Sequence, residues 1–213
     1  MSYLSELNLI PFLDVIGTFV FALSGIRLAS GKNIDWFGAY VIGLVTAIGG
    51  GTTRDILLDT MPFWMQDSKY LLATGVAFLA ILLFKEKLFR FGNTLFLFDA
   101  IGLGLFTVTG ISKSLDAGLP VWVCIILGTI TGSVGGVLRD IIINEVPLLF
   151  RKDLYALASI AGGIVFFICY HFNLPRPFPE LVAAGTVILI RIIAVKFHLQ
   201  LPILKPIDQE NKS

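Results

Sequence analysis

Residues Gly43–Ile56 read GLVTAIGGGTTRDI and residues Gly128–Ile141 read GTITGSVGGVLRDI, so the same motif stands twice in this chain. The two copies are offset by 85 residues, and this offset aligns identical residues on both sides of the motif without a gap. These further pairs are Asp14 with Asp99, Gly17 with Gly102, Phe21 with Phe106, Gly25 with Gly110, Pro62 with Pro147, Tyr70 with Tyr155 and Ala73 with Ala158. A duplication of apolar segments is typical of transporter-like and channel-like membrane folds, whose working site lies where the copies meet.

The composition indicates an all-α membrane protein that crosses the bilayer several times. Apolar residues make up 56% of the 213 residues and charged residues only 15%, with a mean hydropathy of +0.86. A soluble domain usually has about 25% charged residues. The net charge of +1, without a basic run among aromatics, gives no sign of nucleic-acid binding. No nucleotide-binding loop, metalloprotease helix, nucleophile elbow or metal-ligand spacing is present, so we expect no enzyme, no cofactor and no metal.

Hydropathy predicts seven membrane-spanning helices. They are Ile10–Leu28, Phe37–Leu58, Tyr70–Phe84, Leu95–Ser112, Val121–Ile143, Leu154–Phe172 and Leu181–Phe197. A span needs about 20 residues; the third segment is short, but its equivalence to the sixth supports it. We therefore predict one three-helix copy at 10–84, a second at 95–172, a seventh helix at 181–197 and a cytoplasmic tail at 198–213.

Loop charges predict the orientation. The side that holds the N-terminus has three basic residues, Lys69, Lys113 and Arg176. The opposite side has ten, namely Arg27, Lys32, Lys85, Lys87, Arg90, Arg151, Lys152, Lys196, Lys205 and Lys212. Because basic loops stay cytoplasmic, we expect the N-terminus outside and the C-terminus inside. Three helices per copy is an odd number, so the second copy must enter the membrane with the opposite sense, as an inverted repeat.

Glycines interrupt the second and fifth segments near their middles, at Gly49, Gly50 and Gly51 and again at Gly135 and Gly136. Each interior glycine destabilises a helix by roughly 0.5–1 kcal/mol relative to alanine. Close helix packing through small residues is one interpretation; three consecutive glycines favour a kink or an unwound turn. The hydroxyls of Thr46, Thr131 and Ser133 lie near the glycines, where such groups replace the hydration shell of an ion.

Charged residues lie within the predicted spans, at Arg54, Asp55, Arg139, Asp140, Asp14 and Asp99. Each costs about 2.5–3.5 kcal/mol on insertion scales, so they must face the protein interior or water. Neighbouring helical residues point about 100° apart, so we expect Arg54 to pair with an aspartate of another helix rather than with Asp55. A structural ion-pair network and a role along a polar path both remain open.

Paired Gly-Gly-x-x-Arg-Asp motifs on the second and fifth of seven spans resemble the prokaryotic trimeric intracellular cation (TRIC) channels, a family that also has a glycine-transporter label. The resemblance covers residues 10 to 197. It implies a homotrimer in the bacterial inner membrane, with a pore in each protomer that conducts potassium and other monovalent cations. It also implies that the pore is lined by the second and fifth helices and that their glycines are the kink positions. The second copy departs from the pattern, because Val134 replaces the first glycine.

The sequence therefore leaves two hypotheses for the function. The leading hypothesis is a passive channel for monovalent cations, and the alternative is a secondary transporter for a small amino acid such as glycine. Inverted repeats and broken helices suit both.

Overall fold

A computed structural model describes residues 9–90 and 94–202, and the part of the predicted tail at 203–213 lies outside them. Within these residues the chain is all helical, apart from one isolated bridge between Asp153 and Gln200. The helices are α1 (Ile10–Ala29), α2 (Trp36–Leu57), α3 (Phe63–Gln66), α4 (Lys69–Arg90), α5 (Thr94–Asp116), α6 (Val121–Ile142), the 3-10 helix η2 (Leu148–Phe150), α7 (Ala156–His171) and α8 (Pro177–Lys196). The predicted all-α class is confirmed.

Helix starts follow local sequence signals. The Asp35 carboxylate caps α2 by accepting a hydrogen bond of 2.7 Å from the amide of Gly38. Proline stands in the first turn of α1 and of α8, where the missing amide hydrogen leaves no helical bond unmade.

Helix ends match between the two copies. Asn33 after α1 and Gly118 after α5 are offset by 85 residues, and both have positive φ, at 52° and 75°. Asp59 after α2 and Asn144 after α6 repeat this correspondence, at 53° and 59°. Asparagine, aspartate and glycine tolerate this left-handed conformation, so equivalent helices of the two copies end with the same backbone conformation.

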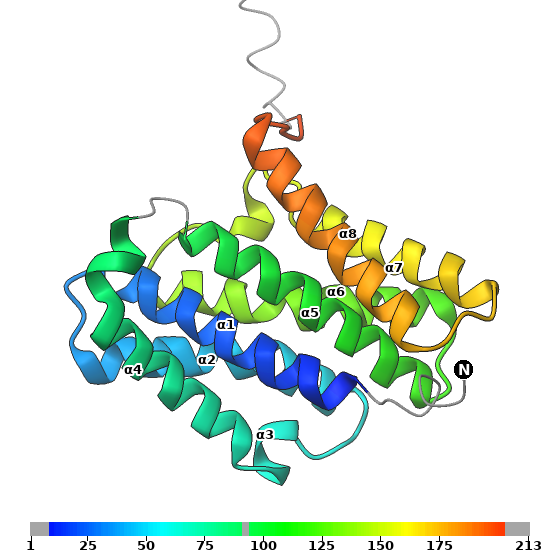
Figure 1. The fold of residues 1–213 in the computed structure, drawn as a ribbon, viewed down its shortest axis with the longest axis horizontal. Coiled ribbons are helices and arrows are strands. Elements are labelled where there is room, and N and C mark those ends of the chain that lie inside the picture. Colours follow the sequence, from blue (N-terminus) through cyan, green and yellow to red (C-terminus); the bar gives the residue numbers. More distant parts are fainter. Residues whose placement is uncertain (1–8, 91–93, 203–213) are drawn as a thin grey trace, which may run out of the picture.

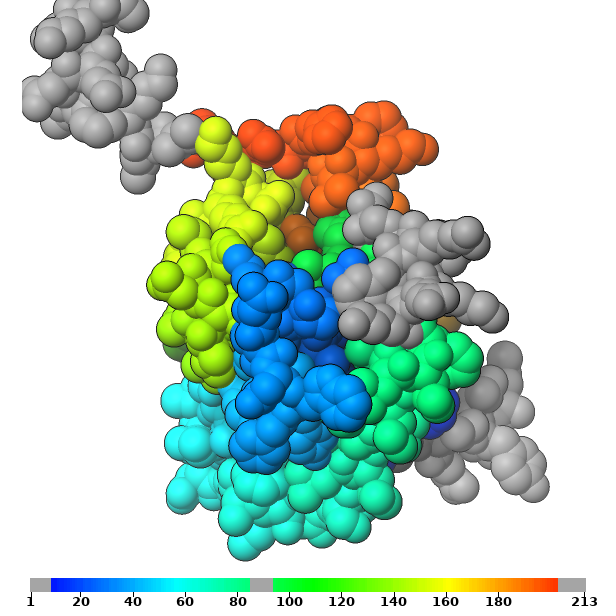
Figure 2. Space-filling view, turned by 90° about the vertical axis from the view of Figure 1, so that its left-hand side faces the viewer, coloured from blue at the N-terminus to red at the C-terminus, as the bar shows by residue number. Residues whose placement is uncertain are grey.

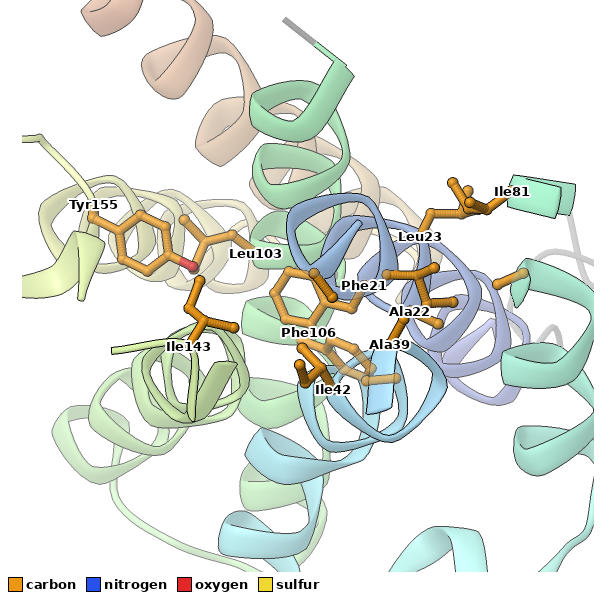
Figure 3. Packing of buried hydrophobic residues seen from close by; sticks show 14 of the residues in the cluster. Phe21, Ala22, Leu23, Ala39, Ile42, Ile81, Leu103, Phe106, Ile143 and Tyr155 are labelled. Atoms are coloured by element: carbon orange, nitrogen blue, oxygen red, sulfur yellow. The ribbon is translucent and has the colours of Figure 1, made fainter. Parts of the chain in front are cut away.

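The four helices α1, α2, α5 and α6 form the centre of the molecule, with α4 against α1 and with α7 and α8 against α5 (Figure 1). Helix α1 runs antiparallel to α5, since Asp14 near the start of α1 meets Lys113 near the end of α5. At the midpoint the rings of Phe21 and Phe106, which are repeat mates, lie 5.3 Å apart between the two helices (Figure 3). The contacts of one copy on the other are therefore reciprocal.

The glycines bring α2 and α6 into close contact. A Cβ added at Gly50 would lie 2.0 Å from the carbonyl oxygen of Thr131, and one added at Gly135 would lie 2.2 Å from that of Thr46. Both helices continue through their glycines without a break, so the unwound turn that the sequence suggested is absent here. Packing through small residues is what these two glycines provide in this conformation.

Four of the described helices are long and apolar enough to cross a membrane, namely α1, α5, α6 and α8. Helix α7 has 16 residues, and α2, with 22 residues, contains the Arg54–Asp55 pair. Each of the seven predicted segments coincides with one long helix. Whether all seven span the bilayer stays a prediction.

Candidate functional site: two charged clusters

The first charged cluster consists of Asp14, Arg54, Asp55 and Lys113. The guanidinium of Arg54 contacts Asp55 Oδ1 through Nε at 2.8 Å and through Nη2 at 2.7 Å. The other oxygen of Asp55 accepts a hydrogen bond of 2.8 Å from the amide of Phe63, the first residue of α3. Asp55 therefore neutralises its neighbour and also fixes the turn that follows α2.

A second ion pair completes this cluster between α1 and α5. The ammonium group of Lys113 lies 2.7 Å from Asp14 Oδ2. Both cations of the cluster contact the Phe63 ring, with Lys113 Nζ 5.4 Å and the Arg54 guanidinium carbon 5.6 Å from its centroid. Asp14 and Arg54 are buried, whereas the Lys113 side chain is 28% exposed and reaches toward solvent.

The second charged cluster consists of Asp99, Arg139, Asp140 and Arg191. Arg139 donates from Nε to Asp140 Oδ1 at 2.8 Å and from Nη1 to Asp99 Oδ1 at 2.8 Å. The same Nη1 donates to Ser24 Oγ on α1 at 2.7 Å. Asp140 Oδ2 accepts from the amide of Leu148 at 3.0 Å, as its repeat mate does from Phe63. Arg139 thus ties α6 to both α1 and α5.

The predicted partners of the arginines are half right. Arg139 does meet an aspartate of another helix, but it also pairs with its neighbour Asp140. For Arg54 the prediction is wrong, because its partner is Asp55. The angle of 100° applies to the Cβ directions. A long arginine side chain can curve back, and its five donors can reach a carboxylate that itself turns toward the loop.

Two cations of these clusters were missed by the sequence reasoning. Lys113 was counted as a loop charge, although it lies in the last turn of α5. Arg191 lies within the seventh predicted span, where a charge is itself a signal of function. It was overlooked because α8 has no counterpart in the duplication.

Each cluster has two basic and two acidic side chains and is therefore neutral. Removing one member of a buried ionic pair typically costs about 3–5 kcal/mol, since the other charge stays buried without a partner. Balance of this kind lets eight ionisable groups lie among apolar helices.

A cavity adjoins each cluster, at opposite ends of the central helices. The cavity beside the first cluster has a volume of about 520 Å³, and Asp55, Tyr70 and Lys113 are among its lining residues. The cavity beside the second has about 300 Å³ and is lined in part by Asp99, Arg139 and Arg191. Figure 2 shows the second end of the molecule, where a recess lies between the end of α8 (orange-red) and the segment before α7 (yellow).

Glu145 lines the second cavity from a loop and is held there by two basic side chains. It accepts a hydrogen bond from Lys32 and lies 3.5 Å from Arg151. The bond from Lys32 lowers the pKa of the Glu145 carboxyl below its ordinary value. No three His, Cys, Asp or Glu side chains within residues 9–90 and 94–202 are grouped as a metal site requires.

The predicted path-lining hydroxyls lie between the two clusters. Thr46 and Thr131 are buried at the crossing of α2 and α6, and Ser133 is close to fully buried. Each donates to the carbonyl four residues earlier in its own helix, all at 2.6 Å. Gly49 and Gly51 pack against Leu138 and Phe63, while a Cβ at Gly136 would meet Tyr155 Oη at 2.9 Å. Their role in a pore stays a prediction.

Comparison with known proteins gives consistent matches over nearly the whole chain. A family model described as "Glycine transporter" matches twice, at residues 11–86 and 96–171. The UPF0126 inner membrane protein YadS of Escherichia coli K12 is 39% identical over 197 residues, which are 91% of this chain and 95% of that protein.

Solved structures agree in fold. A TRIC trimeric intracellular cation channel orthologue from Rhodobacter sphaeroides superposes with a TM-score of 0.84 at 32% identity, covering 91% of this chain and all of that chain. A second structure, from a study of conductance through TRIC cation channels, has a TM-score of 0.82 at 34% identity and covers 92% of this chain and 97% of that chain.

Proposed function

Because this chain belongs to the prokaryotic TRIC family, we propose that it is a channel for monovalent cations, potassium among them, in a bacterial inner membrane. The observation that carries the proposal is the pair of neutral charged clusters with cavities at opposite ends of four central helices. Water-filled vestibules on both faces are what a passive path needs, and buried charges beside them are typical of such paths.

We place the path of each protomer between α2 and α6. The crossing at which Gly50 faces Thr131 and Gly135 faces Thr46 belongs to the same two helices whose Asp55 and Arg139 line the two cavities. The contact is closed in this conformation, so conduction needs the helices to separate or bend there. Glycines permit such a bend, and the carbonyls and hydroxyls of Thr46 and Thr131 would then be available to an ion.

The orientation and assembly complete the proposal. Seven helices span the membrane, with the N-terminus outside and the second cluster on the cytoplasmic side. The antiparallel packing of α1 on α5 supports the inversion of one copy relative to the other. By analogy with the trimeric orthologue, the protein assembles as a homotrimer. The transporter alternative is not favoured, because the similar solved structures are described as cation channels.

The decisive experiment is recording from planar bilayers with the purified protein. We expect unitary currents in potassium chloride. In a gradient of this salt, the reversal potential should have the sign expected for a channel that is selective for cations over anions. Liposomes without protein, prepared in the same detergent, are the control. Saturable glycine uptake without unitary currents would contradict the channel proposal and show that the protein is a carrier.

The orientation is tested by reporter fusions. A reporter fused after Ser213 is expected to lie in the cytoplasm. A reporter inserted after Gly118, in the short connection between α5 and α6, is expected to lie outside. The charge asymmetry of the loops is the physical reason. A C-terminal reporter found outside would overturn both the orientation and the count of seven spans.

A further inference from the structure

Arg191 is a buried cation on the one long helix that lies outside the duplication. Its guanidinium lies over two aromatic rings, with its central carbon 4.8 Å from the centroid of Tyr155 and 5.1 Å from that of Phe96. Its Nη2 is 4.0 Å from Asp99 Oδ2. Arg191 and Asp99 both line the second cavity, so this pair faces the space through which an ion would enter.

Several polar atoms at this place lack a hydrogen bond. They are Asp99 Oδ2, Tyr155 Oη and two nitrogens of Arg191, Nε and Nη1, all fully buried. The separation of 4.0 Å between Arg191 and Asp99 is too long for a hydrogen bond. Asp99 Oδ1 is occupied by Arg139, so Oδ2 is a free acceptor beside a cavity. Because buried polar groups normally have a partner, unpaired ones beside a cavity point to a water molecule or an ion at this place.

The first cluster also holds buried atoms without a hydrogen bond, both oxygens of Asp14 and two nitrogens of Arg54, but there a cation reaches the carboxylate. Its equivalent carboxylate, Asp14, is in direct contact with Lys113 at 2.7 Å. The position equivalent to Lys113 in the first copy is Leu28, which also lines the second cavity and brings no charge. The second cation near Asp99 is therefore Arg191 of α8, whose Nη2 lies 4.0 Å from Asp99 Oδ2 without direct contact. Asp99 Oδ2 thus lacks the direct cation contact that Asp14 Oδ2 has, and this leaves it accessible to a competing ion.

We propose that Asp99 Oδ2, with the Tyr155 hydroxyl, binds the permeant monovalent cation at the cytoplasmic vestibule and that Arg191 is a tethered cation that competes for this site. This inference rests on the proposed channel function and assigns its specificity to named residues. Carboxylate and hydroxyl oxygens suit hard cations such as potassium. Gly136 lies beside both acceptors, since a Cβ there would lie 2.9 Å from Tyr155 Oη and 3.6 Å from Asp99 Oδ1 and would crowd them.

Arg191→Gln then has a defined consequence. The second cluster would retain two carboxylates and one guanidinium, so its charge would be −1 and a potassium ion would restore neutrality. We expect the potassium concentration for half-maximal conductance to fall by about tenfold, a change worth ~1.4 kcal/mol. Arg191→Lys keeps the charge and should resemble the wild type.

The test measures binding apart from conduction. The melting temperature of the purified protein in detergent is compared in potassium chloride and in choline chloride of equal concentration. We expect potassium to stabilise Arg191→Gln more than the wild type, and the double variant Arg191→Gln with Asp99→Asn to lose this dependence. Arg176→Gln is the matched control, because it removes an arginine at the other end of α8, where its partner Asp116 is exposed.

Each outcome decides the matter. Equal potassium dependence in Arg191→Gln and the wild type overturns the site, whether or not currents are seen. Potassium-dependent stabilisation without unitary currents keeps the site and removes the channel proposal. If Arg191→Gln does not fold, Asp99→Asn in the wild-type background serves instead, because retention of any potassium dependence there contradicts the assignment.

Discussion

Gly50→Ala is expected to destabilise the protein by ~1–3 kcal/mol, the usual cost of forcing a methyl group into a packed contact. The added Cβ would lie 2.0 Å from the carbonyl oxygen of Thr131 and 2.9 Å from its carbonyl carbon. Both are backbone atoms, so no rotamer change can relieve the clash and α6 must move away from α2. The measurements are the melting temperature in detergent and the fraction of protein that elutes as one species.

Matched glycines on other helices give the control. Nothing lies within 4 Å of a Cβ added at Gly75 on α4 or at Gly185 on α8. Alanine at these two positions is expected to stabilise the helix by roughly 0.5–1 kcal/mol, the opposite sign. Gly135→Ala should behave as Gly50→Ala does, since its Cβ would meet Thr46 in the same way. If Gly50→Ala were as stable as Gly75→Ala, the close crossing of α2 and α6 would be wrong.

Arg139→Gln is expected to cost about 3–5 kcal/mol, because a buried aspartate would lose its partner. Its guanidinium holds Asp140 on its own helix, Asp99 on α5 and Ser24 on α1. The loss therefore loosens the packing of three helices. Thermal unfolding and chemical denaturation in detergent measure the change.

Two further variants separate pairing from packing. Arg54→Gln is expected to cost less, since its ion pair is confined to Asp55 on its own helix. Adding Asp99→Asn to Arg139→Gln should recover part of the lost stability, because the uncompensated carboxylate is removed. Strict additivity of the two changes would show that Arg139 and Asp99 are not coupled.

The alignment of the two copies was enough to predict which helices and positions correspond in the fold. The offset aligns Asn33 with Gly118 and Phe21 with Phe106, and in the structure the first two follow equivalent helices while the two rings face each other. Insertion cost alone predicts that Asp14, Asp99 and both Arg-Asp pairs face the protein interior or water, and the structure buries all six residues. These inferences needed no knowledge of how the helices pack.

Side-chain partners and glycine roles required the structure. The pairing of Arg54 with Asp55 depends on where a long side chain bends, which a helical wheel does not contain. The glycine triplet suggests a kink by propensity, whereas the contact of Gly50 with Thr131 depends on how α2 crosses α6. Arg191 was missed because it has no repeat mate, although its position in an apolar segment was visible.

The charge balance of the clusters constrains how the chain is made in the membrane. Each copy contributes two aspartates and one arginine to its own cluster, so neither of these sets is neutral by itself. The first becomes neutral when α5 arrives with Lys113, and the second when α8 arrives with Arg191. A nascent chain that has inserted only its first three long helices therefore carries an uncompensated acid. The second cluster reaches neutrality only when α8 has inserted, so α8 is the helix that completes the charge balance of the bundle.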